Sequence, residues 1–369
     1  MKAIFFANTD WYLFNFRLDF AKFLQEKGWE VVLMAPEGEH TDRMIQEGFR
    51  FIPFNFSRKG INPLTERNTI ARITRIYQQE KPDLVHHFTV KCVIYGSIAA
   101  KRCGIPSIIN SITGLGFVFL DTKPFTRLLR KVVSALYRKA LAGTQVIFEN
   151  PDDAALFQEI GLSDDENSNI ILGTGIDTDV FHPIAPPDST PLTILPARML
   201  WDKGVGDFVK AAEILKNKEL DCRFALVGRK DDGNPNSISY EQLTQWQKEG
   251  FVEWWGWQED IITVISICDI VCLPSYREGL PKILIEAAAC ARPIVTTNVP
   301  GCREVVAEGV TGFLVPPKDP KSLAYALEKL IRSPEMRKEM GIASRKRAIN
   351  LFSTNRVNTE IYAVYQKAR

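Results

Sequence analysis

The feature that most constrains this chain is the regular alternation of short apolar runs with longer amphipathic stretches. In the first half, the runs that predict strands are Ala3–Ala7, Val31–Pro36, Arg50–Phe54, Leu84–His87, Ser107–Ser111 and Gln145–Glu149. Helical periodicity fills the gaps, most clearly over Leu13–Glu26, Thr65–Glu80 and Phe125–Leu141. Continuous apolar strands separated by helices are typical of a parallel sheet covered on both faces. The pattern therefore predicts a doubly wound α/β domain.

A second series of the same kind follows residues 182–191, which contain four prolines and are typical of a linker. Its predicted strands are Leu192–Ala197, Arg223–Val227, Val252–Trp254, Ile270–Leu273, Pro293–Thr296 and Gly312–Val315. We expect a Rossmann-like domain over 1–183, another over 184–350, and a C-terminal helix over 351–369 that is free to cross back to the first domain. Ligands of open α/β sheets bind beyond the carboxyl ends of the strands. Two such domains facing a central cleft would enclose a ligand and exclude water.

Composition narrows the setting in which the chain works. Formal net charge is only +2, but residues 50–149 carry 16 Lys and Arg against 5 Asp and Glu, which favours a local anionic partner. The seven cysteines form no CxxC pair and the four histidines make no zinc pattern, so we expect buried free thiols in a reducing compartment. The apolar run before Asn8 is too short for a signal peptide, and no run of about 18 apolar residues occurs. We therefore expect a cytoplasmic protein whose membrane contact is peripheral.

The most informative segment is Ser275–Glu286, which reads SYREGLPKILIE and joins a predicted buried strand to a predicted helix. Pro281 suits the first helical turn, and Gly279 lets the backbone approach a ligand closely. The N–H groups at the helix start are expected to point at an anion. Two carboxylates, Glu278 in the loop and Glu286 in the helix, are placed to accept hydrogen bonds from sugar and ribose hydroxyls.

With Glu278 and Glu286, this segment resembles the E-x7-E motif, in its EGLP form, of the retaining family 4 glycosyltransferases, which have a GT-B fold. Other motifs follow in the family's order: Gly175-Ile-Asp177 with Phe181 and Pro183, Ala197-Arg198 with Lys203-Gly204, Pro300-Gly301 with Glu304, and Gly309 with Gly312–Val315. At the front, Asn8–Asp10, Asn15–Arg17 and Asn110–Gly116 resemble the subgroup that builds capsular polysaccharides, O-antigens and lipid-linked glycans. The resemblance covers nearly the whole chain.

The resemblance implies which residues bind the sugar donor. Arg198 and Lys203 match the cations that bind the donor diphosphate, and fixed cations would stabilise the negative charge of the leaving group. Glu286 matches the glutamate that holds the ribose, and Glu278 belongs to the loop that holds the transferred sugar. The other residues expected on the donor side are Gly279, Leu280, Gly228 and Gly256. The family uses no metal in place of these cations, so we expect no metal and no other cofactor.

On the acceptor side, the residues expected to line the site are Asn15, Arg17, His86, Thr113 and Gly114. The family often has a histidine near the reacting carbon, where this chain has Thr113. Threonine can hydrogen-bond a sugar hydroxyl but cannot act as a general base near neutral pH. His86 and His87 end a predicted strand, and both a site role and a structural role are open. We assign no catalytic base, because in some models of retaining transfer the leaving phosphate takes the acceptor proton.

A basic amphipathic helix is predicted over residues 123–141, where apolar positions recur at helical spacing among Lys and Arg. Arg127, Arg130 and Lys131 are expected to bind an anionic membrane surface. The alternative is a core helix with a solvated basic face. Nucleic acid is not expected as a partner, because no recognised binding motif accompanies the charge.

Three weaker patterns stay open or are set aside. Trp254, Trp255 and Trp257 around Gly256 are interpreted either as lining the site or as packing, and the Gly114-Leu-Gly116 pair of glycines is a weak signal by itself. Asp177-Thr-Asp179 imitates a metal-binding DxD motif, but no histidine lies near it in the sequence and we expect no metal there.

The resulting hypothesis is an enzyme on the inner face of the cell membrane. It would move a hexose or N-acetylhexosamine, with retention of configuration, from a UDP-sugar to a polyprenyl-diphosphate-linked glycan. Two alternatives are a nucleotide-sugar epimerase of GT-B fold and a non-enzymatic two-domain binding protein.

Overall fold

The computed structural model describes residues 1–57, 60, 62–115 and 124–368, with side chains after the second gap from residue 129 onward. The chain forms two compact units, residues 1–174 with 357–369 and residues 175–356. Residues 175–183, which the sequence analysis assigned to the first domain, lie in the second unit. Their backbone is fixed there by Arg345, whose guanidinium donates to the carbonyl oxygens of Phe181 (2.5 Å) and Thr178 (2.7 Å).

Unit 1 is built on a parallel sheet of seven strands in the order β3-β2-β1-β4-β5-β6-β7. The strands are β1 (Lys2–Phe6), β2 (Glu30–Ala35), β3 (Arg50–Pro53), β4 (Leu84–Phe88), β5 (Ser107–Ile112), β6 (Gln145–Phe148) and β7 (Ser168–Ile170). Successive strands are added on one side of β1 up to β3 and on its other side from β4 onward, and β1 and β4 pair in parallel from Ala3 with Leu84. This change of side is the topological switch point, where ligands of such sheets bind.

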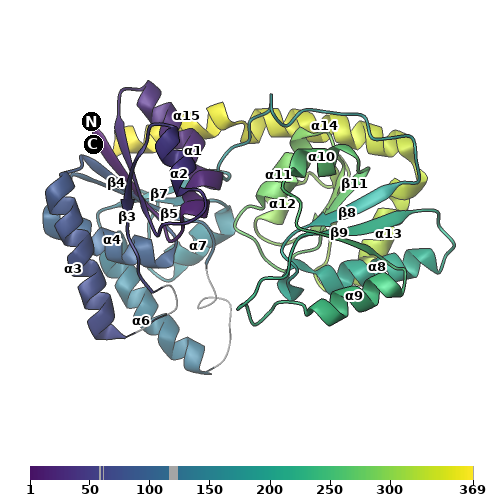
Figure 1. Cartoon of the computed structure of the whole chain (residues 1–369), viewed down its shortest axis with the longest axis horizontal. Coiled ribbons are helices and arrows are strands. Elements are labelled where there is room, and N and C mark those ends of the chain that lie inside the picture. Colours follow the sequence, from purple (N-terminus) through teal and green to yellow (C-terminus); the bar gives the residue numbers. More distant parts are fainter. Residues whose placement is uncertain (58–59, 61, 116–123, 369) are drawn as a thin grey trace. The chain divides into compact units, whose positions relative to one another are not determined.

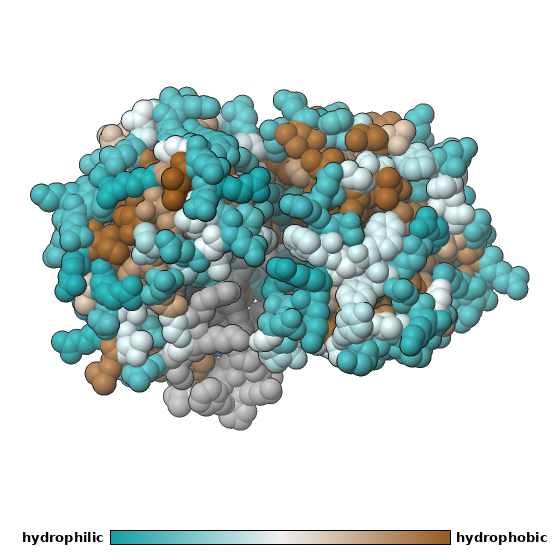
Figure 2. All heavy atoms as spheres, viewed as in Figure 1, coloured by the Kyte–Doolittle hydropathy of each residue, from teal (hydrophilic) through white to brown (hydrophobic). Residues whose placement is uncertain are grey.

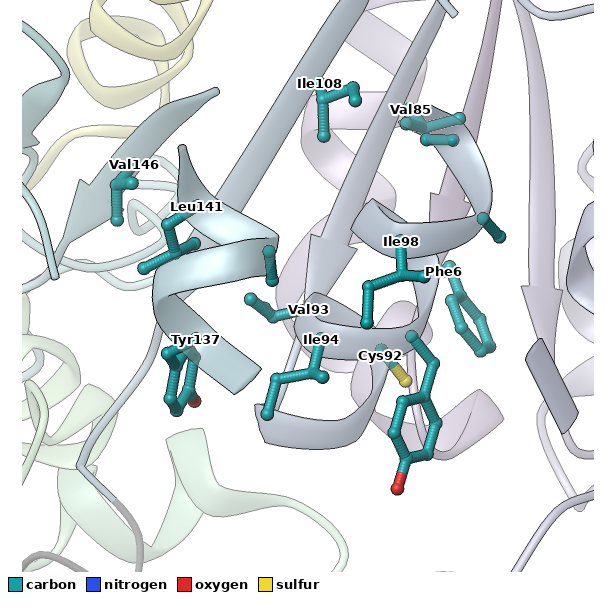
Figure 3. Close-up of a cluster of buried hydrophobic side chains, with 14 of the residues drawn as sticks. Phe6, Val85, Cys92, Val93, Ile94, Ile98, Ile108, Tyr137, Leu141 and Val146 are labelled. Carbon is teal, nitrogen blue, oxygen red and sulfur yellow. The ribbon is translucent and has the colours of Figure 1, made fainter. Parts of the chain in front are cut away.

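Helices cover both faces of this sheet (Figure 1). They are α1 (Asp10–Glu26), α2 (Thr41–Gln46), α3 (Pro63–Glu80), α4 (Val90–Cys103), α6 (Pro124–Leu141), α7 (Pro151–Glu159) and α15 (Thr354–Lys367). One apolar cluster joins the sheet to α3, α4, α6 and α7, and Figure 3 shows Val85 of the sheet with Ile98 of α4 and Tyr137 of α6. A second cluster joins the opposite face to α1, α2 and α15.

The C-terminal helix α15 is an integral part of unit 1. Val357, Ile361 and Tyr365 are fully or almost fully buried in the cluster that also contains α1. The Ser107 hydroxyl at the start of β5 donates to the carbonyl oxygen of Ala368 at 2.9 Å. The chain therefore returns to its first unit, an arrangement that the sequence left open.

Unit 2 repeats the architecture with six parallel strands in the order β10-β9-β8-β11-β12-β13. The strands are β8 (Leu192–Pro196), β9 (Arg223–Val227), β10 (Glu253–Gly256), β11 (Ile270–Leu273), β12 (Ile294–Thr297) and β13 (Gly312–Val315). Its helices are α8 (Val205–Lys216), α9 (Tyr240–Lys248), α10 (Ile261–Ser266), α11 (Lys282–Ala289), α12 (Cys302–Val305), α13 (Pro320–Arg332) and α14 (Pro334–Phe352). The predicted fold class, two doubly wound α/β domains, is confirmed.

The face shown in Figure 2 is mostly hydrophilic, and its apolar side chains lie in small separate groups. Within the described residues, none of the helices combines the length and the hydropathy needed to cross a bilayer.

Candidate functional site

The residues predicted to bind the donor lie at the carboxyl edge of the unit 2 sheet, around its topological switch point between β8 and β11. β8 ends at Pro196 and leads directly to Arg198 and to a single 3₁₀ turn over Trp201–Lys203. β11 ends at Leu273 and leads to the loop that contains Glu278. Because the two strands are neighbours and parallel, both loops emerge on the same edge of the sheet.

Lys203 and Glu278 join these two loops. The Lys203 ammonium lies 2.5 Å from Oε1 of Glu278, and the Ser275 hydroxyl donates to the same oxygen at 2.6 Å. The backbone N–H of Tyr276 donates to the carbonyl oxygen of Asp202 at 2.9 Å, which adds a backbone link between the loops. Side-chain exposure of 20% for Lys203 and 12% for Glu278 leaves this pair partly accessible.

Glycine permits the close contact between these loops. Gly204 has φ +70°, and a Cβ there would lie 2.0 Å from the carbonyl oxygen of Pro274. At the next strand end, a Cβ on Gly228 would lie 1.9 Å from the carbonyl oxygen of Ala197. The N–H of Gly228 donates to the carbonyl oxygen of Gly256 at 2.7 Å, so these two predicted donor residues are neighbours.

Arg198 forms an ion pair of its own. Its Nη1 lies 2.5 Å from Oδ2 of Asp231, which follows β9, and its side chain is 60% exposed. The two predicted cations therefore each have a different carboxylate partner, Asp231 for Arg198 and Glu278 for Lys203.

Glu286 lies almost buried in α11, with 8% exposure. Burial raises the pKa of its carboxyl group, and Lys282, 3.9 Å away on the same helix, opposes that effect. Pro281 occupies the N-cap position, which has no side-chain cap, while Gly279 and Leu280 lie half-buried in the loop before it. The motif thus places a partly buried carboxylate in the loop and an almost buried one in the helix.

The tryptophans around Gly256 have different roles. The indole N–H of Trp254 donates to the carbonyl oxygen of Gly228 at 2.9 Å, and that of Trp255 donates to Glu253. Trp257 is 58% exposed, with the Arg229 guanidinium 5.2 Å from its ring centre. Trp254 and Trp255 therefore hold local structure, and Trp257 presents an open aromatic surface.

The DxD-like segment caps a turn. Oδ1 of Asp177 accepts hydrogen bonds from the backbone N–H groups of Asp179 (2.9 Å) and Val180 (3.1 Å). In the described part of the chain, no group of three or more His, Cys, Asp or Glu side chains is arranged to hold a metal ion.

On unit 1, Thr113 and Gly114 lie at the carboxyl end of β5. They line a small pocket together with Thr89, Val90, Ser111, Ile112 and Tyr137. Gly114 has φ +135° and open space where a Cβ would be. Gly116, the other glycine of that motif, lies outside the described residues.

Arg17 is buried beside this pocket rather than on its surface, with 3% exposure. Its guanidinium donates to the Tyr12 hydroxyl (2.7 and 3.1 Å) and lies 3.4 Å from Glu149, which directly follows β6. The same group stacks 4.5 Å from the ring centre of Phe88. Asn15, two residues before Arg17 on α1, is half-buried and donates from its amide to the carbonyl oxygen of Trp11 at 2.9 Å.

The assignment of His86 to the acceptor surface is corrected by the structure. His86 has no exposed surface, and its two ring nitrogens lie 2.8 Å from the hydroxyls of Tyr365 and Ser111. Burial, with Arg17 and His87 nearby, lowers its pKa well below the usual range. Every residue of β4 is buried, because helices cover both faces of the sheet, so a histidine in this strand is interior.

The basic helix α6 packs one side into the core of unit 1 and exposes another. Tyr137, Ala140 and Leu141 are buried, whereas Val132 is 52% exposed and Lys131 is exposed. Arg130 is half-buried. The side chain of Arg127 lies outside the described residues.

Among the residues at these two edges that were not predicted are Ser275, Asp231 and Tyr12. Ser275 was inside the quoted motif, and its spacing of three residues from Glu278 is the signal that could have marked it. Asp231 contacts Arg198 across 33 residues of sequence and only through the fold, whereas Tyr12 precedes Arg17 by five residues on the same helix.

Comparison with known proteins agrees with this architecture. The family described as "Glycosyl transferase 4-like" matches residues 2–150, and the family described as "Glycosyl transferases group 1" matches residues 178–347. The crystal structure of HepE from Anabaena in complex with UDP superposes with a TM-score of 0.81 over 100% of both chains at 19% identity, which shows a shared fold.

Two relatives align along most of their length. The chain is 29% identical over 351 residues to the N,N'-diacetylbacillosaminyl-diphospho-undecaprenol alpha-1,3-N-acetylgalactosaminyltransferase of Campylobacter jejuni, with 91% of each chain covered. It is 24% identical over 359 residues to the capsular polysaccharide biosynthesis glycosyltransferase CapM of Staphylococcus aureus, covering 93% of this chain and 91% of the relative. With one family matching its first half and the other its second, the chain belongs to the group 1 and 4-like glycosyltransferases, and it is a glycosyltransferase of GT-B fold.

Proposed function

We propose that this enzyme transfers a hexose or N-acetylhexosamine from a UDP-sugar to a polyprenyl-diphosphate-linked glycan, with retention of configuration. The observation that carries the proposal is the Lys203–Glu278 pair at the carboxyl edge of unit 2, inside the loops that match the family's donor motif. The diphospho-undecaprenol acceptor in the name of the Campylobacter relative supports the acceptor class, and the UDP in HepE supports the donor class.

In the proposed donor complex, the diphosphate binds Lys203 and Arg198. Both cations are held by carboxylates in this structure, at 2.5 Å each, and both keep exposed surface through which a phosphate can reach them. An arginine fork suits two phosphate oxygens, and a lysine supplies a point charge. Glu278, once Lys203 turns to the phosphate, accepts hydrogen bonds from the transferred sugar, and Glu286 accepts them from the ribose.

The proposed step is a substitution on one face of the sugar. The bond from the anomeric carbon to the leaving phosphate oxygen breaks, and a bond from the acceptor hydroxyl oxygen to that carbon forms on the same face. The acceptor proton passes to the departing phosphate oxygen, so UDP leaves and no protein base is needed. Lys203 and Arg198 stabilise the charge that develops on the diphosphate.

We assign the charge stabilisation to these side chains and propose that no metal is required. A direct check is turnover in the presence of excess EDTA, which should match turnover without it. Loss of activity that Mg²⁺ or Mn²⁺ restores would contradict this part of the proposal.

Unit 1 is proposed to bind the acceptor, through the pocket that contains Thr113 and Gly114. On α6, Lys131 and Val132 are consecutive and both exposed. A cation beside an apolar side chain suits contact with an anionic lipid surface. We therefore place the enzyme peripherally on the inner face of the cell membrane, with the UDP-sugar, the polyprenyl-diphosphate-linked glycan and an anionic membrane surface as its partners and no nucleic acid.

The test uses the full chain with a panel of UDP-sugars and a polyprenyl-diphosphate glycan. Lys203→Ala and Glu278→Ala are each expected to lower turnover by about 10²-fold, a typical loss for one transition-state contact. Lys218→Ala is the matched control, since Lys218 also forms a 2.6 Å pair with a glutamate of unit 2, Glu328, outside the proposed site. Near-normal turnover in both site variants would refute the assignment.

The same assay separates the alternatives. NMR of the product reports whether the anomeric configuration is retained. A nucleotide-sugar epimerase would convert UDP-sugar without any acceptor, and a binding protein would bind UDP-sugar without releasing UDP.

A further inference from the structure

The carboxylate of Glu278 is held by two groups that reach the same oxygen. The Lys203 ammonium lies 2.5 Å from Oε1, and the Ser275 hydroxyl lies 2.6 Å from it. In the described part of the chain, both of these side-chain contacts of Glu278 end on Oε1. The other oxygen, Oε2, is therefore the acceptor that remains for a ligand beside this partly exposed loop.

The direction of the Ser275 contact follows from its proton. A serine hydroxyl has one proton to donate. Two oxygens lie within its reach, Oε1 of Glu278 at 2.6 Å and the carbonyl oxygen of Asp202 at 3.2 Å. A charged acceptor forms the shorter and stronger hydrogen bond. The Ser275 proton is therefore donated mainly to Glu278, and the carbonyl oxygen is the weaker acceptor.

Ser275 is itself fixed, whereas Lys203 is free to move. Ser275 has no exposed surface, and its carbonyl oxygen accepts a hydrogen bond from the hydroxyl of Thr297 at the end of β12. The next residue, Tyr276, donates from its backbone N–H to the carbonyl oxygen of Asp202 at 2.9 Å. The Lys203 ammonium lies at the end of a flexible four-carbon stem, and its side chain keeps 20% exposure.

The two partners of Glu278 therefore respond differently to a donor diphosphate. The exposed ammonium of Lys203 can turn to a phosphate, whereas the buried, neutral hydroxyl of Ser275 cannot reach one. We propose that Ser275 is a positioning residue that holds the Glu278 carboxylate in place after Lys203 has turned to the diphosphate, so that Oε2 meets a hydroxyl of the transferred sugar. This inference rests on the proposed function and adds a residue to its donor site.

A purely structural role for Ser275 predicts a different pattern of binding. UDP contains the diphosphate and the ribose but lacks the transferred sugar, so the proposed contact of Glu278 is present only with UDP-sugar. Loss of a bond that merely stabilises the loop would weaken the binding of both ligands. Loss of the orientation of Glu278 would weaken the binding of UDP-sugar alone, so the ratio of the two dissociation constants separates these roles.

The experiment measures the dissociation constants of the full chain by isothermal titration calorimetry. The ligands are UDP and whichever of UDP-glucose, UDP-galactose, UDP-N-acetylglucosamine and UDP-N-acetylgalactosamine binds the unmodified chain most tightly. Ser275→Ala is expected to weaken the binding of that UDP-sugar by about tenfold, the loss of one hydrogen bond to a charged group. The dissociation constant of UDP should stay within about twofold of its value for the unmodified chain.

Ser344→Ala is the matched control. Ser344 is also a serine of unit 2 without exposed surface, and its hydroxyl donates to the carbonyl oxygen of Thr311 at 2.9 Å, outside the proposed site. It should change neither dissociation constant. Melting temperature is recorded for each variant, and if Ser275→Ala unfolds, the measurement is made with Ser275→Cys, which fills the space of the hydroxyl with a weak donor.

A double-mutant cycle tests the same coupling in turnover. Ser275→Ala alone should lower kcat/KM by about tenfold. Glu278→Ala removes the carboxylate that Ser275 orients, so the further addition of Ser275→Ala should lower kcat/KM by less than about twofold. Ser344→Ala should leave kcat/KM unchanged in both backgrounds.

The inference is overturned if Ser275→Ala weakens UDP and UDP-sugar equally, if it changes neither, or if its loss of kcat/KM is undiminished in the Glu278→Ala background. These results leave the proposed function standing as long as Lys203→Ala and Glu278→Ala lose turnover. Near-normal turnover in those two variants overturns the proposed function instead. The ratio of the two dissociation constants then still decides whether Ser275 acts on the sugar.

Discussion

Replacing Glu149 with glutamine should remove a specific pH dependence from the stability of unit 1. Glu149 is 7% exposed, and its main neighbour is Arg17 at 3.4 Å. Burial raises the pKa of its carboxyl group to about 7, from an ordinary value of 4.5, although Arg17 acts in the opposite direction. The cost of desolvation therefore exceeds the attraction of a loosely spaced ion pair.

The sign follows from proton binding. Between pH 4.5 and about 7, the folded state holds the Glu149 proton more tightly than the unfolded state. Unfolding therefore releases protons, and the stability from this group falls as pH rises through that window. At about 1.4 kcal/mol for each pH unit, the full loss is about 3 kcal/mol.

Native-state hydrogen exchange of the core amides of β1 and β4 measures the stability of unit 1 separately from unit 2. The free energy of unfolding of unit 1 in the unmodified chain, less that in Glu149→Gln, should fall by about 3 kcal/mol from pH 4.5 to 7 and then level off. In Glu149→Gln, Arg17 also loses its carboxylate partner, and this lowers the stability of the variant by the same amount at every pH, because arginine stays charged throughout. Glu339→Gln, on the surface of α14, is the control. A flat difference, or one that grows with pH, would refute the reasoning.

Two further predictions concern the carboxyl edge of the unit 2 sheet and the basic helix α6. Gly228→Ala should destabilise unit 2 by about 3 kcal/mol or more, because the added Cβ would lie 1.9 Å from a carbonyl oxygen. Gly250→Ala is the control, since Gly250 also has a positive φ but open space around it, and it should cost about 1–2 kcal/mol. Equal losses of stability in calorimetry would contradict this prediction. Charge reversal at Arg127, Arg130 and Lys131 should weaken binding to anionic vesicles by tenfold or more, at about 1 kcal/mol per charge. The control, Lys338→Glu with Lys346→Glu on α14, should leave vesicle binding unchanged. Unchanged partitioning of the α6 variant would exclude α6 as the membrane contact.

Most of the fold could be predicted, because buried parallel strands leave a strong signal. β4 and β11 are apolar or buried along their whole length, and their bounds agree with the prediction to within one residue. The exception is β7, which pairs with β6 at the edge of the sheet and was not predicted. It has three residues, and Ile170 is 49% exposed, so neither its length nor its pattern distinguishes it from a loop.

The site was less predictable than the fold, because its contacts join distant parts of the chain. The motif placed Glu278 and Glu286 in the right loop and helix, since both lie within one local segment. The pairing of Glu278 with Lys203 spans 75 residues and depends on β8 and β11 being neighbours. The prediction that His86 lines the acceptor surface was wrong for a related reason. The sequence shows that His86 lies near the end of a strand, but not that helices still cover the sheet at that point.

Two of the cation–carboxylate pairs at the strand ends, Lys203 with Glu278 and Arg17 with Glu149, differ in their exposure. Lys203 and Glu278 keep 20% and 12% side-chain exposure, so a ligand can reach both groups and exchange partners with them. Arg17 and Glu149 keep 3% and 9%, and no ligand can displace either from the other. A buried pair of this kind adds little stability, because the cost of desolvation offsets the attraction of the charges. What it supplies is a fixed position for the Arg17 guanidinium, which donates to the Tyr12 hydroxyl. The exposed pair is therefore the one to test by ligand binding, and the buried pair by the pH dependence of the stability of unit 1.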